Sequence, residues 1–275
     1  MTTLSAFLLG LVQGVAEFLP ISSSGHLSIA QNLLGMTVEE NHFFDVLLHL
    51  GTLLAVLVAY WADIVGMVRE FFLGIRDLAR HDTEKVPPAR RLVLLVIVGT
   101  LPLFLVLPIK DKVELLYSNM WFIGGALLVT GCLLFLSDRY NKGHKTEKTA
   151  TIKDVLLIGV CQVVATAPGI SRSGMTITAG CFRNFDRRFA VRFSFLLSIP
   201  AVLGANFLSL LDVIKDGGID MALLPACFVG VLTAAVSGYL SICLLRFVAE
   251  KGRFGAFAYY CWAAGALTLI LNILQ

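Results

Sequence analysis

The chain has 275 residues, of which 57% are hydrophobic and only 15% are charged, and its mean hydropathy is +0.82. This composition excludes a water-soluble globular protein, because a soluble domain of this length needs far more charge on its surface. The small net charge of +3 and the lack of any nucleic-acid-binding motif argue against a nucleic-acid partner. The sequence therefore predicts an all-α polytopic membrane protein, in which each crossing takes roughly 20 apolar residues.

The first expected element, residues 4–35, is an apolar segment with a break in its middle. Its two arms are each too short to cross a bilayer, and they are joined at Pro20, just before a cluster of serines. Non-helical backbone at membrane depth is tolerated only where it is buried in protein or lines a wet cavity. We therefore expect a re-entrant helical hairpin here.

Three full spans follow and complete the first half of the chain, residues 1–137. They are Phe44–Trp61, Arg91–Pro108 and Trp121–Leu136. Between the first two, the amphipathic stretch Ile64–Leu78 is expected to lie along the cytoplasmic face of the membrane. Trp61 and Trp121 stand at span ends, as residues of an aromatic belt do. A polar cytoplasmic linker, residues 138–152, leads to the second half, residues 153–275.

The second half opens with a segment, residues 153–182, that repeats the first hairpin. At an offset of 149 residues and without a gap, the identical pairs are Gly10/Gly159, Gln13/Gln162, Val15/Val164, Ala16/Ala165, Ile21/Ile170, Ser22/Ser171, Ser24/Ser173, Gly25/Gly174 and Ala30/Ala179. Three more spans follow, at Phe189–Leu211, Leu223–Leu245 and Phe254–Leu274. Broken helices in matching positions of two halves indicate a binding site near the membrane midplane.

Basic residues gather in four loops, which predicts the orientation of the chain. These loops are residues 63–91, 138–153, 183–192 and 246–253, and the positive-inside rule places them in the cytoplasm. The first hairpin and the loops 109–120 and 212–221 then face outward, while the second hairpin opens to the cytoplasm. The two halves are thus expected to form an inverted-topology repeat. If either hairpin crossed the membrane fully, everything after it would be inverted.

Glu17 is the first candidate for chemistry. It lies within an apolar helix, and Gln13 lies four residues earlier on the same face. An ionisable group at membrane depth is costly, so it usually faces a cavity or a partner and serves a function. The alternative is a structural carboxyl group that is hydrogen-bonded across the helix bundle.

Directly after Pro20 comes the run Ser22, Ser23, Ser24, Gly25 and His26. Serine is a good N-cap, so this run should open the second arm of the hairpin. A helix N-terminus offers free N–H groups and partial positive charge, which suit a phosphate. One hydroxyl, or His26, could also act as a nucleophile, and His26 could move protons. The alternative is a capping serine with a histidine bonded to backbone.

The matching break of the second hairpin, Pro168–Gly174, carries Arg172, the only basic residue expected deep in the membrane. Its planar fork of donors matches phosphate oxygens. The buried charge needs an anion, which could be Glu17, a substrate phosphate, or each in turn. Ser171, Ser173, Gly174 and, one turn further on, Thr176 accompany it. If the two breaks meet at the midplane, together they suit the binding and transfer of phosphoryl groups.

Asp45 and His49 form a second polar pair, four residues apart near the start of the first full span. They could assist a metal or the mouth of the site, or they could form an interfacial hydrogen bond. The six cysteines lie in or beside apolar segments and show neither metal-ligand nor disulfide spacing. We expect them to serve packing.

These motifs carry a resemblance to a known family over essentially the whole chain. The stretch from Gln13 to Glu17, the run Pro20–His26 and the run Pro168–Gly174 resemble the Glu/Gln-x-x-x-Glu, Pro-x-Ser-Ser-x-Gly-His and Pro-Gly-x-Ser-Arg-Ser-Gly motifs of the undecaprenyl-diphosphate phosphatases of the bacitracin-resistance family. The resemblance implies a catalytic core of Glu17, Ser23, His26 and Arg172. It also implies a phosphate-binding shell, which comprises Gln13, Ser22, Ser24, Gly25, Ser171, Ser173, Gly174 and Thr176.

The implied reaction is hydrolysis of the C55 lipid undecaprenyl diphosphate to undecaprenyl phosphate and inorganic phosphate, which recycles the lipid carrier of cell-wall polysaccharide synthesis and gives bacitracin resistance. Ser23 or His26 would attack, or would position water, while Glu17 acts as base or orients His26. The family is associated with Mg²⁺ or Ca²⁺. Because Gln13 stands where other members have a second carboxylate and the sequence shows no dense carboxylate cluster, we expect the cation to accompany the pyrophosphate, with Glu17 as a candidate ligand. The resemblance also implies a homodimer in the bacterial plasma (inner) membrane, and the topology above opens the site to the outer, periplasmic face.

Two other functions compete with this one. A polyprenyl-phosphate flippase or transporter would also use inverted repeats with broken helices, and fold alone does not decide function. A type-2 phosphatidic acid phosphatase also uses a Ser-Gly-His motif, but it needs a His after its later Arg, and no His follows Arg172.

Overall fold

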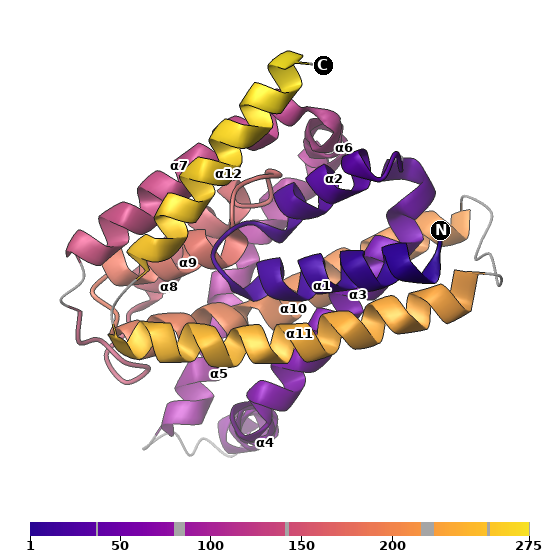
Figure 1. Ribbon diagram of the computed structural model, residues 1–275. Helices are drawn as coiled ribbons and strands as arrows, with labels where there is room; N and C mark the ends of the chain where they lie inside the picture. Colours follow the sequence, from indigo (N-terminus) through magenta and orange to yellow (C-terminus); the bar gives the residue numbers. More distant parts are fainter. Residues whose placement is uncertain (37, 80–85, 141–142, 216–222, 252–253, 275) are drawn as a thin grey trace.

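The computed structural model describes the chain except for residues 37, 80–85, 141–142, 216–222, 252–253 and 275 (Figure 1). Its named elements are helices, joined by short connections. They are α1 (Thr3–Phe18), α2 (Ser23–Leu33), α3 (Val38–Ala59), α4 (Trp61–Ala79), α5 (Pro88–Thr100), the 3₁₀ helix η1 (Leu101–Ile109), α6 (Lys110–Glu114), the 3₁₀ helix η2 (Leu115–Ser118), α7 (Met120–Tyr140), α8 (Ile152–Val164), α9 (Arg172–Phe182), α10 (Arg187–Lys215), α11 (Leu224–Lys251) and α12 (Gly255–Leu274). The all-helical prediction is confirmed.

Both predicted hairpins are helix–break–helix segments. In the first, α1 ends at Phe18, and α2 begins after Ser22, which has a φ of 74° and caps the helix. A non-glycine residue in this left-handed region is strained, and such strain is typical of functional sites. In the second, α8 ends at Val164 and α9 begins after the capping residue Ser171. Each second arm has only 11 residues, which is about half of what a crossing needs.

Five helical segments of the described chain are long and apolar enough to cross a membrane, and a bent pair could form a sixth span. The five are Pro88–Ser118, Met120–Arg139, Arg187–Asp212, Leu224–Lys251 and Gly255–Leu274. The bent pair joins Phe43–Ala59 to Trp61–Leu78 at an angle of 84°. The predicted span Phe44–Trp61 therefore ends slightly too late, because the helix breaks before Trp61. Parts of the basic loops (80–85, 141–142 and 252–253) and most of the loop 212–221 lie outside the described residues.

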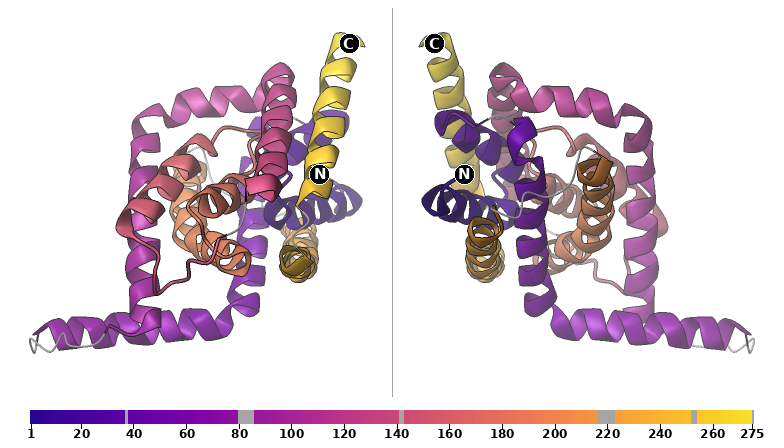
Figure 2. Two further views of the ribbon diagram at one scale, coloured as in Figure 1. Left: turned by 90° about the vertical axis from the view of Figure 1, so that its left-hand side faces the viewer. Right: turned by 90° about the vertical axis from the view of Figure 1, so that its right-hand side faces the viewer.

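The predicted amphipathic stretch Ile64–Leu78 is α4, which runs along the lower edge of the molecule, nearly at right angles to α3 (Figure 2). Large apolar side chains are exposed along one face of it, including Val68, Phe72 and Ile75. Arg90 of α5 holds the helix through ion pairs with Glu70 and Asp77. Such a helix is suited to lie in the plane of a membrane interface.

The two halves exchange matching contacts. The first arm of each hairpin packs on a helix of the other half, α1 along α11 and α8 against α5. A pair of glycines lies at each contact: a Cβ on Gly10 would lie 2.5 Å from the carbonyl oxygen of Gly230, and one on Gly159 would lie 2.3 Å from that of Gly99. A side chain at either position would push the helices apart, so glycine allows this backbone contact.

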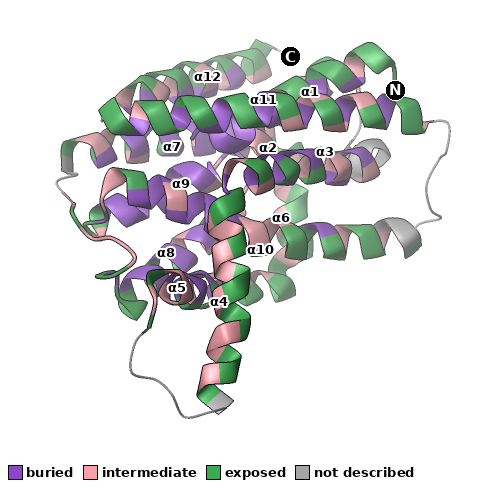
Figure 3. Cartoon of the chain, turned by 90° about the horizontal axis from the view of Figure 1, so that it is seen from below, coloured by how far each residue is buried: buried purple, intermediate pink, exposed green. Residues whose placement is uncertain are grey.

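The outer surface is apolar, and the polar site residues are inside. Exposed residues follow the outer faces of α4, α11 and α12, whereas α9 is almost wholly buried (Figure 3). Phe104, Phe228 and Leu240 are among the many large apolar side chains that are more than 60% exposed. In water, such a surface would aggregate, but it suits the hydrocarbon of a bilayer. The chain is a multi-pass membrane protein.

Candidate active site

The two hairpin breaks touch each other, through glycines that follow the two capping serines. A Cβ on Gly25 would lie 3.1 Å from the Cα of Gly169, and a Cβ on Gly174 would lie 3.3 Å from the Cβ of Pro20. The N-termini of α2 and α9 are therefore brought to one place, and each contributes free N–H groups and partial positive charge. Two such termini form an environment that favours an anion.

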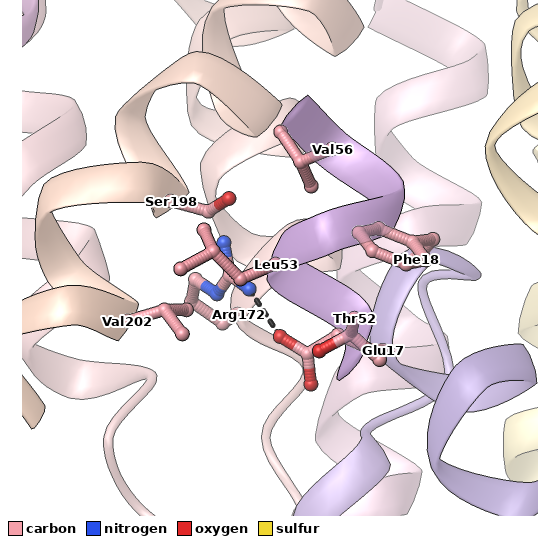
Figure 4. Close-up of a pocket in the computed structure, with 8 residues that line it drawn as sticks. All are labelled: Glu17, Phe18, Thr52, Leu53, Val56, Arg172, Ser198 and Val202. Atoms are coloured by element: carbon pink, nitrogen blue, oxygen red, sulfur yellow. Dashed lines mark hydrogen bonds and ion pairs between the residues drawn. The ribbon is translucent and has the colours of Figure 1, made fainter. Parts of the chain in front are cut away.

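Glu17 is the centre of a polar network at this place. Its side chain is only 6% exposed, and one carboxylate oxygen, Oε1, pairs with the guanidinium of Arg172 (Figure 4). The other oxygen, Oε2, accepts hydrogen bonds from Gln13 Nε2 at 3.1 Å and from Ser23 Oγ at 2.6 Å. The carboxylate is thus stabilised in its charged form by a cation and two donors. The short bond to Ser23 places a base beside a hydroxyl, as nucleophile activation requires.

Arg172 has donors left after it binds Glu17. Its NH1 group is buried and has no hydrogen-bond partner among the described residues. Arg172 also lines a narrow hollow together with Glu17, Thr52 of α3 and Ser198 of α10 (Figure 4). A buried donor without a partner is costly, and an anion such as a phosphate would satisfy it. Sequence reasoning missed Thr52 and Ser198, because hydroxyl side chains are common in apolar helices and carry no signal of their own.

The other serines shape the two helix starts in matching ways. Ser22 Oγ accepts from the N–H of Gly25 at 3.3 Å, and Ser171 Oγ accepts from that of Gly174 at 3.0 Å. Each capping serine also pairs with the serine two residues on: Ser22 with Ser24 at 3.3 Å, and Ser171 with Ser173 at 3.2 Å. These predicted phosphate-binding residues therefore surround the point where the breaks meet.

Thr176 differs from the other predicted phosphate-binding residues, because it contacts α10. Its hydroxyl lies 2.6 Å from the hydroxyl of Ser194 on α10 and donates to the carbonyl of Arg172 at 2.9 Å. Only 1% of the residue is exposed. It anchors α9 to α10 and so fixes the position of Arg172, rather than facing Glu17.

His26 is set apart from Glu17. Its Nδ1 lies 2.8 Å from the carbonyl oxygen of Ser22, and its Nε2 lies 2.9 Å from the hydroxyl of Tyr260 on α12. The two rings are stacked, with centroids 5.5 Å apart. A carbonyl only accepts, so Nδ1 carries the proton and Nε2 accepts from Tyr260. Ser22 and Tyr260 orient this ring, and the suggestion that Glu17 does so finds no contact among the described residues. The sequence did not single out Tyr260, which lies 234 residues away.

Asp45 and His49 join the same region from α3. Asp45 accepts two hydrogen bonds from Gln31 Nε2 of α2, at 2.8 and 3.1 Å. His49 Nε2 lies 4.0 Å from Glu17 Oε2, and its Nδ1 lies 2.8 Å from the backbone oxygen of Asp45. The four-residue spacing was the signal for this pair. The structure places His49 beside the carboxylate of Glu17, while Asp45 bonds to Gln31 of α2.

The donor set does not form a resident metal centre. No group of three or more His, Cys, Asp or Glu side chains that could hold an ion is found in the part of the chain that the structure describes. Glu17 is the single carboxylate of the network, and its oxygens already face a guanidinium and two donors. Divalent cations of the Mg²⁺ or Ca²⁺ type need several oxygen ligands, so these residues alone do not fit one.

Comparison with known proteins identifies the family. The model of the family "Bacitracin resistance protein BacA" matches residues 6–267. A protein of Methanosphaera stadtmanae named undecaprenyl-diphosphatase is 41% identical over 277 residues, with 98% of each chain covered. Proteins of the same name from Methanobrevibacter smithii and Alkaliphilus metalliredigens are 42% and 41% identical, with 99% and 100% of each chain covered. The chain therefore belongs to the bacitracin resistance protein BacA family.

Proposed function

We propose that the protein is a membrane phosphatase that hydrolyses undecaprenyl diphosphate to undecaprenyl phosphate and inorganic phosphate. The observation that carries this proposal is the network of Ser23, Glu17 and Arg172 at the meeting point of two helix N-termini. A hydroxyl, a base and a guanidinium are the parts that phosphoryl transfer needs. The names of the relatives supply the substrate, and the apolar outer surface allows the lipid tail to stay in the bilayer.

In the first step, Ser23 is the nucleophile. Its Oγ lies 2.6 Å from Glu17 Oε2, so the carboxylate takes the hydroxyl proton as Oγ forms a bond to the terminal phosphorus. The bond from that phosphorus to the bridging oxygen breaks, and the lipid monophosphate leaves with the bonding electron pair. Arg172 and the two helix N-termini stabilise the charge on the transferred phosphoryl oxygens. His26 is the weaker nucleophile candidate, because Tyr260 occupies its Nε2 lone pair.

In the second step, water hydrolyses the phosphoserine. The water oxygen bonds to phosphorus and the bond from phosphorus to Ser23 Oγ breaks. Oγ receives the proton held since the first step, and both protons of the water leave with the phosphate. Inorganic phosphate leaves, and the hydrogen bond between Ser23 and Glu17 forms again. Glu17 thus serves as base in the first step and returns a proton in the second.

A divalent cation would be brought by the diphosphate. The pyrophosphate oxygens are hard ligands for Mg²⁺ or Ca²⁺, and the described residues include no group of three or more His, Cys, Asp or Glu side chains that could hold the ion. When bound, such a cation would neutralise charge on the leaving phosphate. Glu17 is the candidate side chain to contact it.

The site is proposed to open to the outer face of the plasma membrane. The support comes from the basic loops, which the positive-inside rule assigns to the cytoplasm. A cysteine at Ser118, exposed on η2, should react in intact cells with a membrane-impermeant thiol reagent, whereas one at Lys148, exposed in the linker, should not. Both variants need a background without reactive native cysteines. The resemblance further implies a homodimer, which light scattering of the purified protein can test.

The decisive experiment is phosphate release from undecaprenyl diphosphate by the purified protein in detergent, with and without Mg²⁺ or Ca²⁺. Detergent micelles have no second compartment, so the assay measures hydrolysis and not transport. Ser23→Ala and Arg172→Ala should each lose at least about 100-fold in kcat. Ser118→Ala, a serine away from the Glu17 network, is the control and should keep full activity. Wild-type protein that is folded and releases no phosphate under any of these conditions would refute the proposal.

A further inference from the structure

His49 faces the carboxylate of Glu17 from a third element, α3. Its Nε2 lies 4.0 Å from Glu17 Oε2, which is the same oxygen that accepts from Ser23. The imidazole is 32% exposed, so it stands at the rim of the buried network rather than within it.

The hydrogen bond at the other ring nitrogen determines where the proton is. His49 Nδ1 lies 2.8 Å from the backbone oxygen of Asp45, and a carbonyl oxygen only accepts, so Nδ1 donates. In the neutral ring, Nε2 then carries a lone pair, which faces the negatively charged Oε2 of Glu17. Two acceptors form no hydrogen bond, which is in accord with their separation of 4.0 Å. One added proton would convert this contact into a charge-assisted hydrogen bond.

The position of His49 is held by its own helix and by α2. Asp45, one turn earlier on α3, accepts from Gln31 of α2 through both carboxylate oxygens. Thr52, one turn later, donates to the backbone oxygen of His49 at 2.9 Å. Helix α2, the second arm of the first hairpin, carries Ser23 and is thus hydrogen-bonded to α3, the helix that carries His49.

None of the other hydrogen-bond partners of Glu17 described above can accept a proton from it. Arg172 stays protonated in proteins. The Gln13 amide has already committed its NH₂ group as a donor to Oε2, at 3.1 Å, and an amide is not a base. Ser23 is the source of the proton.

We propose that His49 is a positioning residue for Glu17, which acts by accepting the proton that Glu17 takes from Ser23. This inference rests on the proposed function and extends it. The proton moves from Ser23 Oγ to Glu17 Oε2 and on to His49 Nε2, so that Glu17 regains its negative charge and its pairing with Arg172. When Ser23 Oγ is released in the second step, the proton returns by the same route. No oxidant, reductant or further reactant is needed.

Few charged or titratable groups surround His49 in the described part of the chain, and one of them is Tyr117 of η2, which interacts with Glu17 and Asp45. Glu17 faces it from α1, with Arg172 of α9 behind that carboxylate, and Asp45 lies on its own helix. From α10, Ser198 and Val202 line the adjoining hollow. From α11, the chain packs on neighbouring Gly51 through Val231 and Ala234, and residues 228–238 contain no titratable side chain.

The test is the pH profile of kcat for phosphate release, measured with wild type, His49→Gln and His49→Asn. His144→Gln is the matched control, because His144 is exposed in the linker. Both amides keep a polar side chain at a partly exposed position, and each variant is checked for folding by its elution profile and unfolding temperature. We expect each folded His49 variant to lose about 10- to 100-fold in kcat at pH 7.5, with KM changed less than twofold.

The shape of the profile separates a proton acceptor from a merely structural residue. Wild type and His144→Gln should lose kcat on the acidic side, where a protonated His49 no longer accepts, and the His49 variants should lack that acidic limb. A folded His49 variant that keeps wild-type kcat, or that loses kcat with an unchanged acidic limb, would overturn the inference while leaving the phosphatase intact. Absence of turnover by wild type would instead refute the proposed function.

Discussion

Arg172 and Glu17 are 155 residues apart in the chain, and they form an ion pair where the two hairpins meet. The pair joins the first turn of α9 to the last turns of α1, so each half of the chain supplies one charge. Separately, each would be a costly buried ion. Together they leave the buried NH1 of Arg172 without a partner among the described residues, so it can donate to a further anion. The site is therefore assembled only when both halves are in place.

The first prediction concerns this pair. Glu17→Gln keeps an oxygen that can accept from Ser23, but it removes the base and frees Arg172 from its counter-ion. We expect kcat to fall at least about 1,000-fold, and KM to decrease, because the guanidinium no longer has to share its charge between Glu17 and the substrate. Steady-state kinetics of phosphate release measure both. An unchanged kcat with a raised KM would mean that Glu17 only binds.

The second prediction concerns Tyr260, whose hydroxyl lies 2.9 Å from His26 Nε2. Tyr260→Phe keeps the stacked ring and removes one hydrogen bond, which is worth about 0.5–1.5 kcal/mol. We expect a loss of roughly 2- to 10-fold in kcat, with at most about 1.5 kcal/mol of lost stability, because His26 loses the contact that fixes its ring. Tyr259→Phe is the control, since Tyr259 packs on Phe135 and Trp262 instead. Equal effects of the two substitutions would show that the bond to His26 is irrelevant to turnover.

A third prediction tests the glycine contacts between the halves. Gly10→Ala would place a Cβ 2.5 Å from Gly230 O, and Gly159→Ala one 2.3 Å from Gly99 O. Overpacking of this kind costs about 1–3 kcal/mol, so each variant should unfold several degrees lower in a thermal scan in detergent.

Gly66→Ala and Gly204→Ala are the matched controls for these variants, because an added Cβ there meets nothing within 4 Å. They should be neutral or stabilising, since alanine is the better helix former. Equal stability of all four variants would contradict the close packing.

The fourth prediction concerns pH and Asp154, a fully buried residue in the capping box at the start of α8, outside the spanning helices. Burial by itself raises the pKa of this carboxyl group. Lys145, Thr151 and Arg183 outweigh burial and hold the pKa well below its usual range. A lowered folded-state pKa stabilises the protein above the unfolded-state value near 4, and this stability is lost as pH falls toward the folded-state pKa.

Asp154→Asn should therefore lower the unfolding temperature at pH 7. The difference in unfolding temperature between wild type and variant should shrink as the pH is lowered from about 5 to 3. Thermal unfolding at several pH values measures this. A difference that stays constant over that range would show that the charge of Asp154 does not contribute.

Local sequence was enough to predict the parts of the site that lie within one hairpin. Pro20 and the capping serines Ser22 and Ser171 mark the breaks because their backbone preferences are local. The meeting of Glu17 with Arg172 could also be anticipated, since each needs an opposite charge at membrane depth.

Contacts from other helices were less predictable. Tyr260 has no local signal, because a tyrosine in an apolar helix is equally suited to face lipid. The spacing of Asp45 and His49 predicted a pair, but it did not predict that His49 lies beside Glu17, because that depends on how α3 packs on α1. The sequence groups Thr176 with the serines near it, yet its hydroxyl bonds to Ser194 of α10. The angle between α3 and α4 at Tyr60 was also missed, since no proline or glycine marks it.

The pairing of α1 with α11 has a consequence for biosynthesis. A ribosome adds about 5–20 residues per second, so Gly230 emerges roughly 10–45 s after its neighbour Gly10. During most of that interval Glu17 in the nascent first half lacks its partner Arg172. The face of α1 around Gly10, which packs on α11 in the finished protein, is then exposed to lipid or to the insertion machinery. Chains that stop before α11 should consequently be degraded rather than accumulate as half-proteins, because neither half can bury its own hairpin.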